Sequence, residues 1–192
     1  ETRTWLWQAG AQDIELERWH SDEDASGVRH NFDASTLAPQ IALPHSPALA
    51  RDVDDIEPTP VQIAYIGACT GAKLDDLRAA ARVLAGYHID KRVRLLVAPA
   101  SVRDREAAER EGILRHLQEA GAEILPSACG MCAGYGGTVP EDSTVIASIA
   151  RNFKGRMGPA SAQVFLASPY TVAASALRGR IPGEVLDGRK RG

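Results

Sequence analysis

The sequence lacks a long apolar run and a strong excess of either charge. No stretch approaches the length that an apolar helix needs to cross a bilayer, and the first residues do not resemble a secretory signal. Lys and Arg number 22 against 25 Asp and Glu, a formal net charge of −3. This balance argues against nucleic-acid binding driven by bulk charge. We therefore expect a soluble protein with no membrane or nucleic-acid partner.

Cysteine is also scarce. The three cysteines are an odd number, which does not suit a framework of paired disulfides. Reduced thiols suit metal ligation in a reducing compartment, so we expect a cytoplasmic protein. The hydrophobic fraction of 44% and the charged fraction of 24% are those of a globular domain and argue against wholesale disorder. A length of 192 residues allows one domain with a sizeable flanking segment.

The first 60 residues lack a regular hydrophobic period. They contain all three tryptophans and several prolines, which favour extended or turn conformations over helix. The sequence begins at Glu1 rather than at a methionine, so we expect a processed product, a fragment or a part of something longer. We interpret residues 1–60 as an arm or linker, with a short helix near its start, that packs on a partner or on a missing domain.

After Pro60 the pattern alternates between strands and helices. Short apolar runs rich in β-branched residues predict strands at 61–66, 93–97, 122–125, 144–147 and 163–167. Apolar residues at spacings of three and four predict helices over 74–84 and 101–120, the second interrupted at Gly112. Ser168, Pro169 and Gly179 mark the cap, the first turn and the end of a last helix.

Strands that alternate with helices imply parallel crossover connections. The expected fold class is α/β, a three-layer αβα sandwich around a mainly parallel sheet over residues 61–180. An extended N-terminal arm precedes it, and a loose polar tail over 181–192 follows it. Binding sites in such sheets lie in the loops at the carboxyl ends of the strands. Both loops that carry cysteines follow predicted strands directly, so this edge is the candidate site.

The cysteines are the residues most able to carry chemistry. Cys69 follows the first predicted strand and precedes a helix, whose N-terminal N–H groups would stabilise a thiolate. Cys129 and Cys132 lie in Cys129-Gly-Met-Cys132, within a glycine-rich loop where backbone amides can approach a bound group closely. Three thiolates from two strand-end loops indicate a metal centre.

Other interpretations of these motifs stay open. A Cys-x-x-Cys pair is also typical of redox disulfides and of zinc sites, and a single buried cysteine is often inert. A redox pair leaves Cys69 unexplained, and structural zinc usually takes a fourth ligand, for which no His or further Cys lies close in sequence. Gly67-x-x-x-Gly71 after a strand also raises a nucleotide-binding module, but it lacks the GxGxxG spacing and the later acidic residue.

Three segments, in this order, resemble the aconitase and isopropylmalate dehydratase family: Gly67-Ala-Cys-Thr-Gly71, Ser127-Ala-Cys-Gly-Met-Cys132 and Arg151-Asn-Phe-Lys-Gly-Arg156. The lead-in Leu37-Ala-Pro-Gln-Ile41 and Pro44-His-Ser-Pro47 is similar to prokaryotic 3-isopropylmalate dehydratase and homoaconitase large subunits. The resemblance runs from about Asn31 to Gly179. It implies the cluster-binding C-terminal domain of such a large subunit, similar to aconitase domain 3.

The resemblance implies a [4Fe–4S] cluster held by Cys69, Cys129 and Cys132, with one iron left without a protein thiolate. It further implies a hydro-lyase that dehydrates or isomerises a small hydroxy di- or tricarboxylic acid, such as 3-isopropylmalate or homoaconitate. Arg151 and Arg156 match the substrate-facing arginines of the family, and a planar guanidinium suits a carboxylate. The alternative for both is a solvated surface arginine in an ion pair.

Two positions depart from the family pattern, which usually has asparagine where this chain has Gly71 and Ala150. Their absence removes polar contacts beside cluster or substrate, so the alternative is a non-catalytic or degenerate iron–sulfur binding or sensing module of the same fold. The family also takes its catalytic serine from a swivelling domain and its His and Asp acids from preceding domains. Nothing here matches those groups, so we assign no catalytic residue. Activity is expected only with polypeptides that carry the remaining large-subunit domains and the swivelling small subunit.

Overall fold

The computed structural model describes residues 2–11, 13–135 and 137–181. The chain divides into an N-terminal unit, Glu1–Leu37, and a sheet unit, Ala38–Gly192. The N-terminal unit contains the helix α1 (Thr2–Gln8), as the short helix expected there, and two 3₁₀ turns, η1 (Leu16–Trp19) and η2 (Ala34–Thr36). None of its described residues is buried. It therefore has no hydrophobic core of its own.

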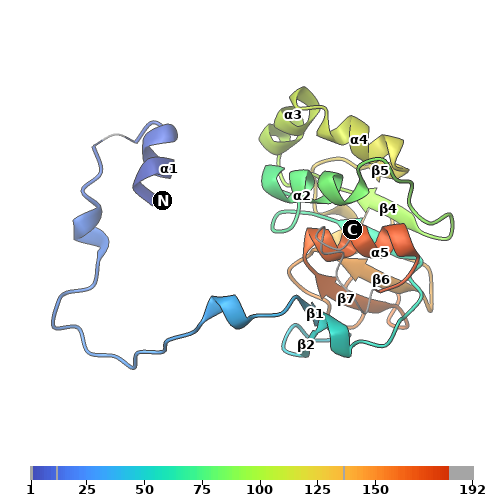
Figure 1. Ribbon diagram of the computed structural model, residues 1–192, viewed down its shortest axis with the longest axis horizontal. Coiled ribbons are helices and arrows are strands. Elements are labelled where there is room, and N and C mark those ends of the chain that lie inside the picture. Colours follow the sequence, from blue (N-terminus) through green and yellow to red (C-terminus); the bar gives the residue numbers. More distant parts are fainter. Residues whose placement is uncertain (1, 12, 136, 182–192) are drawn as a thin grey trace, which may run out of the picture. The chain divides into compact units, whose positions relative to one another are not determined.

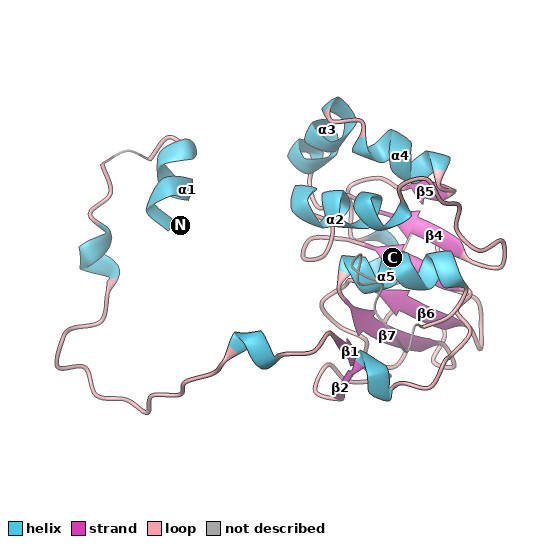
Figure 2. Ribbon diagram, in the orientation of Figure 1, coloured by secondary structure: helices cyan, strands magenta, loops and turns pink. Residues whose placement is uncertain are grey.

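The sheet unit is built on seven strands in the order β2-β1-β7-β6-β3-β4-β5 (Figure 2). The strands β7, β6, β3, β4 and β5 pair in parallel, whereas β1 pairs antiparallel with both β2 and β7. Their bounds are β1 Gln40–Ala42, β2 Ala50–Asp52, β3 Ile63–Ile66, β4 Arg94–Val97, β5 Ala122–Ile124, β6 Thr144–Ala147 and β7 Gln163–Ala167. The predicted α/β fold around a mainly parallel sheet is confirmed.

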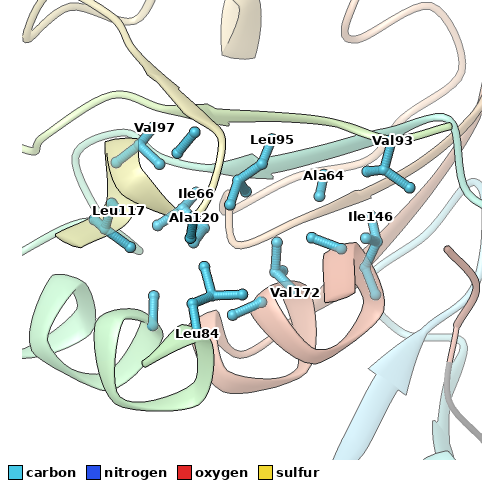
Figure 3. Packing of buried hydrophobic residues seen from close by; sticks show 14 of the residues in the cluster. Ala64, Ile66, Leu84, Val93, Leu95, Val97, Leu117, Ala120, Ile146 and Val172 are labelled. Carbon is cyan, nitrogen blue, oxygen red and sulfur yellow. The ribbon is translucent and has the colours of Figure 1, made fainter. Parts of the chain in front are cut away.

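Four helices cover one face of the sheet, and α2 and α5 lie side by side on it (Figure 1). They are α2 Leu74–Leu84, α3 Val102–Arg110, α4 Ile113–Glu119 and α5 Pro169–Arg178. Figure 3 shows Leu84 of α2 and Val172 of α5 facing strand side chains such as Leu95, with Leu117 of α4 beside them. The apolar side chains of this layer form the larger of two core clusters.

Loops cover the opposite face of the sheet. Side chains of β3, β4, β6 and β7 on this face pack against residues from the segments that follow β5 and β6, among them Met131, Cys132, Ile149 and Met157. The only regular element among these packing partners is the 3₁₀ turn η4, Gly130–Ala133, in the part of the chain that the structure describes. Because both faces are covered, every residue of β3 is buried, as expected of a central parallel strand.

The helix boundaries follow the capping signals in the sequence. Ser101 accepts a hydrogen bond from the backbone N–H of Asp104 at 3.0 Å and opens α3. Gly112 separates α3 from α4 in a left-handed conformation with φ of +73° that an L side chain rarely adopts. Ser168 and Pro169 open α5 as predicted, and Gly179 ends it.

The sheet unit begins earlier than residue 60, where the sequence analysis placed the end of the arm. The strands β1 and β2 lie within residues 1–60, and Ile41 and Val53 are buried in the main core. A second anchor is Asn152, whose buried amide group donates hydrogen bonds to the carbonyl oxygens of Leu43 (2.8 Å) and Val164 (2.9 Å). Residues 40–52 are therefore part of the sheet rather than of an arm.

At the other end of the unit, the buried residue Ile181 donates its backbone N–H to Thr59 O at 2.8 Å. The rest of the tail predicted over 181–192 lies outside the described residues. Among the residues that the structure describes, no helix combines the length and apolar character needed to cross a membrane.

The helix-covered core predicts a clear difference between two leucines. Leu77 of α2 is fully buried, so the change Leu77→Ala leaves a cavity and should lower the free energy of unfolding by about 2–5 kcal/mol. Leu37 is 73% exposed, and Leu37→Ala should change the free energy of unfolding by no more than about 0.5 kcal/mol. Urea unfolding of both variants measures the difference, and equal effects would contradict the assigned core.

Candidate metal centre

The predicted site residues gather at one edge of the sheet because the strands that precede them run in parallel. Cys69 follows β3, Cys129 and Cys132 follow β5, and Arg151 and Arg156 follow β6. The strand β3 lies between β4 and β6, and β5 lies next to β4. The carboxyl ends of these strands therefore bring both cysteine loops and the arginine segment to a common edge.

Cys69 lies at the exposed centre of a turn, Gly67–Gly71, that follows β3 and whose two ends are buried. The helix α2 begins at Leu74, with Lys73 as its cap, so Cys69 precedes the helix as expected, with residues 70–72 between it and the cap. The turn is held instead by Ser148, immediately after β6. Its hydroxyl accepts the N–H of Gly67 at 3.1 Å and donates to Gly71 O at 2.7 Å.

Cys129 and Cys132 are joined by the short turn η4. The N–H of Cys132 donates to Cys129 O at 2.8 Å, which closes the turn. Gly134 ends it with φ of +77°, a conformation that glycine adopts without strain. Cys132 is buried and Cys129 is exposed, and all three cysteines of the chain are free thiols.

The side chain of Tyr65 belongs to the same core cluster as Cys132. It is fully buried, and its hydroxyl makes no hydrogen bond of ordinary geometry within the described part of the chain. Burial raises the pKa of Tyr65 to about 12, and negative charge on Cys132, Cys129 and Cys69 adds to that rise, while the backbone amide of Cys132 opposes it.

The donor set consists of three soft thiols, the ligand type that iron–sulfur clusters take. Among the described residues, no three Cys, His, Asp or Glu side chains are arranged to hold one metal ion. The Tyr65 hydroxyl, buried in the same core cluster as Cys132, is a further donor without an acceptor in the described part of the chain.

Arg156 reaches the cysteines directly. Its Nη2 donates to Cys132 Sγ at 3.7 Å, and its Nε is buried without a partner in the part of the chain that the structure describes. The backbone N–H of Arg156 donates to Phe153 O at 2.8 Å, which folds the segment back toward the site. Arg156 is therefore half-buried with one N–H group still available to an acceptor.

Arg151 lies at the same edge but remains exposed. Within the described residues neither Arg151 nor Arg156 forms an ion pair, unlike the arginines of the helical layer. Neither arginine therefore lies in the solvated surface ion pair that was the alternative interpretation. The structure brings Arg156 to the sulfurs and leaves the guanidinium group of Arg151 open to solvent.

Comparison with known proteins places the chain in a family. The sequence profile described as the aconitase family (aconitate hydratase) matches residues 51–179. This chain belongs to the aconitase family. The match includes all three motifs that carried the resemblance, and the resemblance is confirmed.

Two relatives that cover most of this chain are both large subunits of 3-isopropylmalate dehydratase. The large subunit 2 of 3-isopropylmalate dehydratase from Archaeoglobus fulgidus is 40% identical over 182 residues, which cover 94% of this chain and 44% of that protein. The 3-isopropylmalate dehydratase large subunit from Mycolicibacterium smegmatis is 43% identical over 167 residues, 84% of this chain and 39% of that protein. The chain therefore spans about two fifths of the length of the relatives it matches.

The unpaired hydroxyl of Tyr65 is expected to lower the stability of the metal-free chain by a measurable amount. A buried donor without an acceptor destabilises the fold, so Tyr65→Phe should raise the free energy of unfolding of the metal-free chain by about 1 kcal/mol. Chemical denaturation under anaerobic, chelated conditions measures it. Tyr170→Phe is the matched control, since the Tyr170 hydroxyl accepts from Arg82 at 2.6 Å on the exposed side of α5. A loss of stability in Tyr65→Phe would mean that this hydroxyl has a partner.

Proposed function

We propose that Cys69, Cys129 and Cys132 hold a [4Fe–4S] cluster in which one iron has no protein thiolate. The observation that carries the proposal is that all three free thiols lie on the two loops that follow the parallel strands β3 and β5 at one edge of the sheet. Membership of the aconitase family supports it, because the matched segment contains all three cysteines. When bound, the cluster supplies a Lewis-acidic iron that activates the hydroxyl group of a substrate.

The two arginines bind the carboxylates of the substrate in this proposal. Arg156 has a buried Nε–H without an acceptor, and such a donor in a site of low polarity favours a carboxylate strongly. Arg151 adds a second guanidinium group at the same edge. Two guanidinium groups beside one reactive centre suit a substrate that has two or three carboxylates and orient its hydroxyl group toward the cysteines.

The reaction that we propose is the dehydration or isomerisation of a small hydroxy di- or tricarboxylic acid, similar to 3-isopropylmalate or homoaconitate. The relatives that cover most of this chain are large subunits of 3-isopropylmalate dehydratase, which supports this class of hydro-lyase. In this chain Arg151 and Arg156 bind and orient the acid, and the loop-covered layer under Tyr65 excludes water from one side of the site.

The proton transfers require other polypeptides. The chain spans about two fifths of its relatives, so we propose that the remaining large-subunit domains and a swivelling small subunit supply the acid and base groups. The exposed tryptophans of the N-terminal unit, Trp5 (65%), Trp7 (62%) and Trp19 (81%), support packing of that unit, residues 1–37, on those domains. Three free thiols fit the reducing conditions of the cytoplasm, which we propose as the location.

A second function has a specific observation in its favour. At Gly71 a Cβ atom would overlap the carbonyl oxygen of Ser148, so the turn has no room for the asparagine that the family usually carries there. Ala150 removes a second amide two residues after Ser148. A non-catalytic iron–sulfur binding or sensing module would tolerate both departures, because it needs the cysteines but not the substrate contacts.

Reconstitution of the chain with iron and sulfide, without oxygen, tests the cluster. The wild-type chain should become brown and bind about four irons and four sulfides per chain. Cys69→Ser should lose most of this iron, because a cluster needs a thiolate from each loop. A redox pair made of Cys129 and Cys132 alone would be unaffected by Cys69→Ser. A colourless protein with stoichiometric zinc would contradict the cluster.

Turnover by the assembled complex tests the role of Arg156. With the cluster restored and the partner polypeptides present, Arg156→Lys should lower kcat/KM for dehydration of hydroxy di- and tricarboxylic acids by about 10- to 100-fold, because a bidentate contact is lost. Arg103→Lys, on the exposed face of α3, is the matched control and should retain full activity. A fully loaded, complete complex that dehydrates none of these acids would favour the sensing module.

A further inference from the structure

Ser148 is one of few polar residues buried in the sheet unit. It follows β6 directly and is 7% exposed. Its backbone N–H donates to Tyr65 O at 3.0 Å, which extends the pairing of β6 with β3 by one step beyond the last ladder residues. The position of Ser148 is therefore set by the sheet, the most rigid part of the unit.

The hydroxyl of Ser148 spans the turn that carries Cys69. It accepts the Gly67 N–H at 3.1 Å and donates its own proton to Gly71 O at 2.7 Å. One oxygen atom thus satisfies a buried donor at the start of the turn and a buried acceptor at its end. Cys69 itself makes no hydrogen bond within the described residues, so the path of the turn depends on its two ends.

The backbone of Gly71 lies directly against Ser148. A Cβ atom at position 71 would overlap the carbonyl oxygen and Cβ of Ser148, so no larger residue fits without a shift of the turn. Gly67 is also closely packed, on the other side, where a Cβ would lie 2.6 Å from Tyr65 Cε1. Both ends of the turn are therefore held by contact as well as by hydrogen bonds.

We propose that Ser148 is a positioning residue that fixes Cys69 opposite Cys129 and Cys132 for the metal centre. This inference rests on the proposed cluster, to which Ser148 contributes no ligand. A metal ligand must be held within about 0.5 Å of its working position, and a turn with a solvent-exposed centre is not that rigid by itself. The sheet fixes the position of Ser148, and the two hydrogen bonds of its hydroxyl fix the turn that carries Cys69.

Removal of the hydroxyl tests the inference with two measurements on the 192-residue chain. Ser148→Ala should speed amide hydrogen exchange at Gly67 by about tenfold in the metal-free chain, because that N–H loses its acceptor. After anaerobic reconstitution, the same variant should lose iron to a chelator about tenfold faster than the wild type. Gly71→Ala keeps the hydroxyl but displaces the turn, and it should also speed iron loss.

The matched control is Ser143→Ala, at the other end of β6. Ser143 is equally buried and donates to Pro140 O at 2.7 Å, so its replacement also deletes one buried hydroxyl. It should leave Gly67 exchange and iron release unchanged. Ser148→Thr keeps the hydroxyl and should restore most of the protection at Gly67.

The outcomes separate this inference from the proposed function. Equal amide exchange rates at Gly67 in Ser148→Ala and Ser143→Ala would overturn the positioning role. So would a loss of Gly67 protection in Ser148→Thr as large as that in Ser148→Ala. A wild-type chain that takes up no iron and sulfide would reject the cluster as the purpose of the turn and this inference with it. Normal iron uptake with identical iron release from both alanine variants would overturn the inference alone.

Discussion

The parallel pairing of β3 with β6 and β4 is the constraint on which the rest of the site depends. Parallel strands end at the same edge, and that alignment brings together segments that lie as far apart in sequence as Cys69, Cys132 and Arg156. A slip of β6 by one residue against β3 would turn Ser148 away from the Cys69 turn, because neighbouring side chains of a strand point to opposite faces. Burial of β3 on both faces resists such a slip.

The two faces of the sheet have different roles. The helical face provides most of the apolar core, whereas the loop-covered face contains Tyr65, Cys132 and the residues around them. Loops can place single side chains and backbone carbonyls at angles that a helix does not permit, and a rigid sheet beneath them fixes those angles. The aconitase family sequence thus combines a stable layer and a chemically adaptable layer on one scaffold.

The sequence predicted the elements after Pro60 well, because each has a clear period and clear caps, as Ser168, Pro169 and Gly179 illustrate for α5. It missed β1 and β2, which are short and lack an alternating pattern; β1 is stabilised by its tertiary pairing with β7. The candidate cysteines could be singled out from motif and spacing. The contacts of Tyr65 and Ser148 could not, since an apolar strand and the residue after it carry no local sign of a partner elsewhere in the chain.

The unequal exposure of the three thiols has a consequence for their reactivity. Cys69 and Cys129 are open to solvent, whereas Cys132 is buried within η4 beside Arg156. Peroxide or an alkylating agent therefore reacts first with Cys69 and Cys129, while burial delays its attack on Cys132. Limited alkylation thus labels the two loops at one sulfur each and leaves the innermost thiol intact.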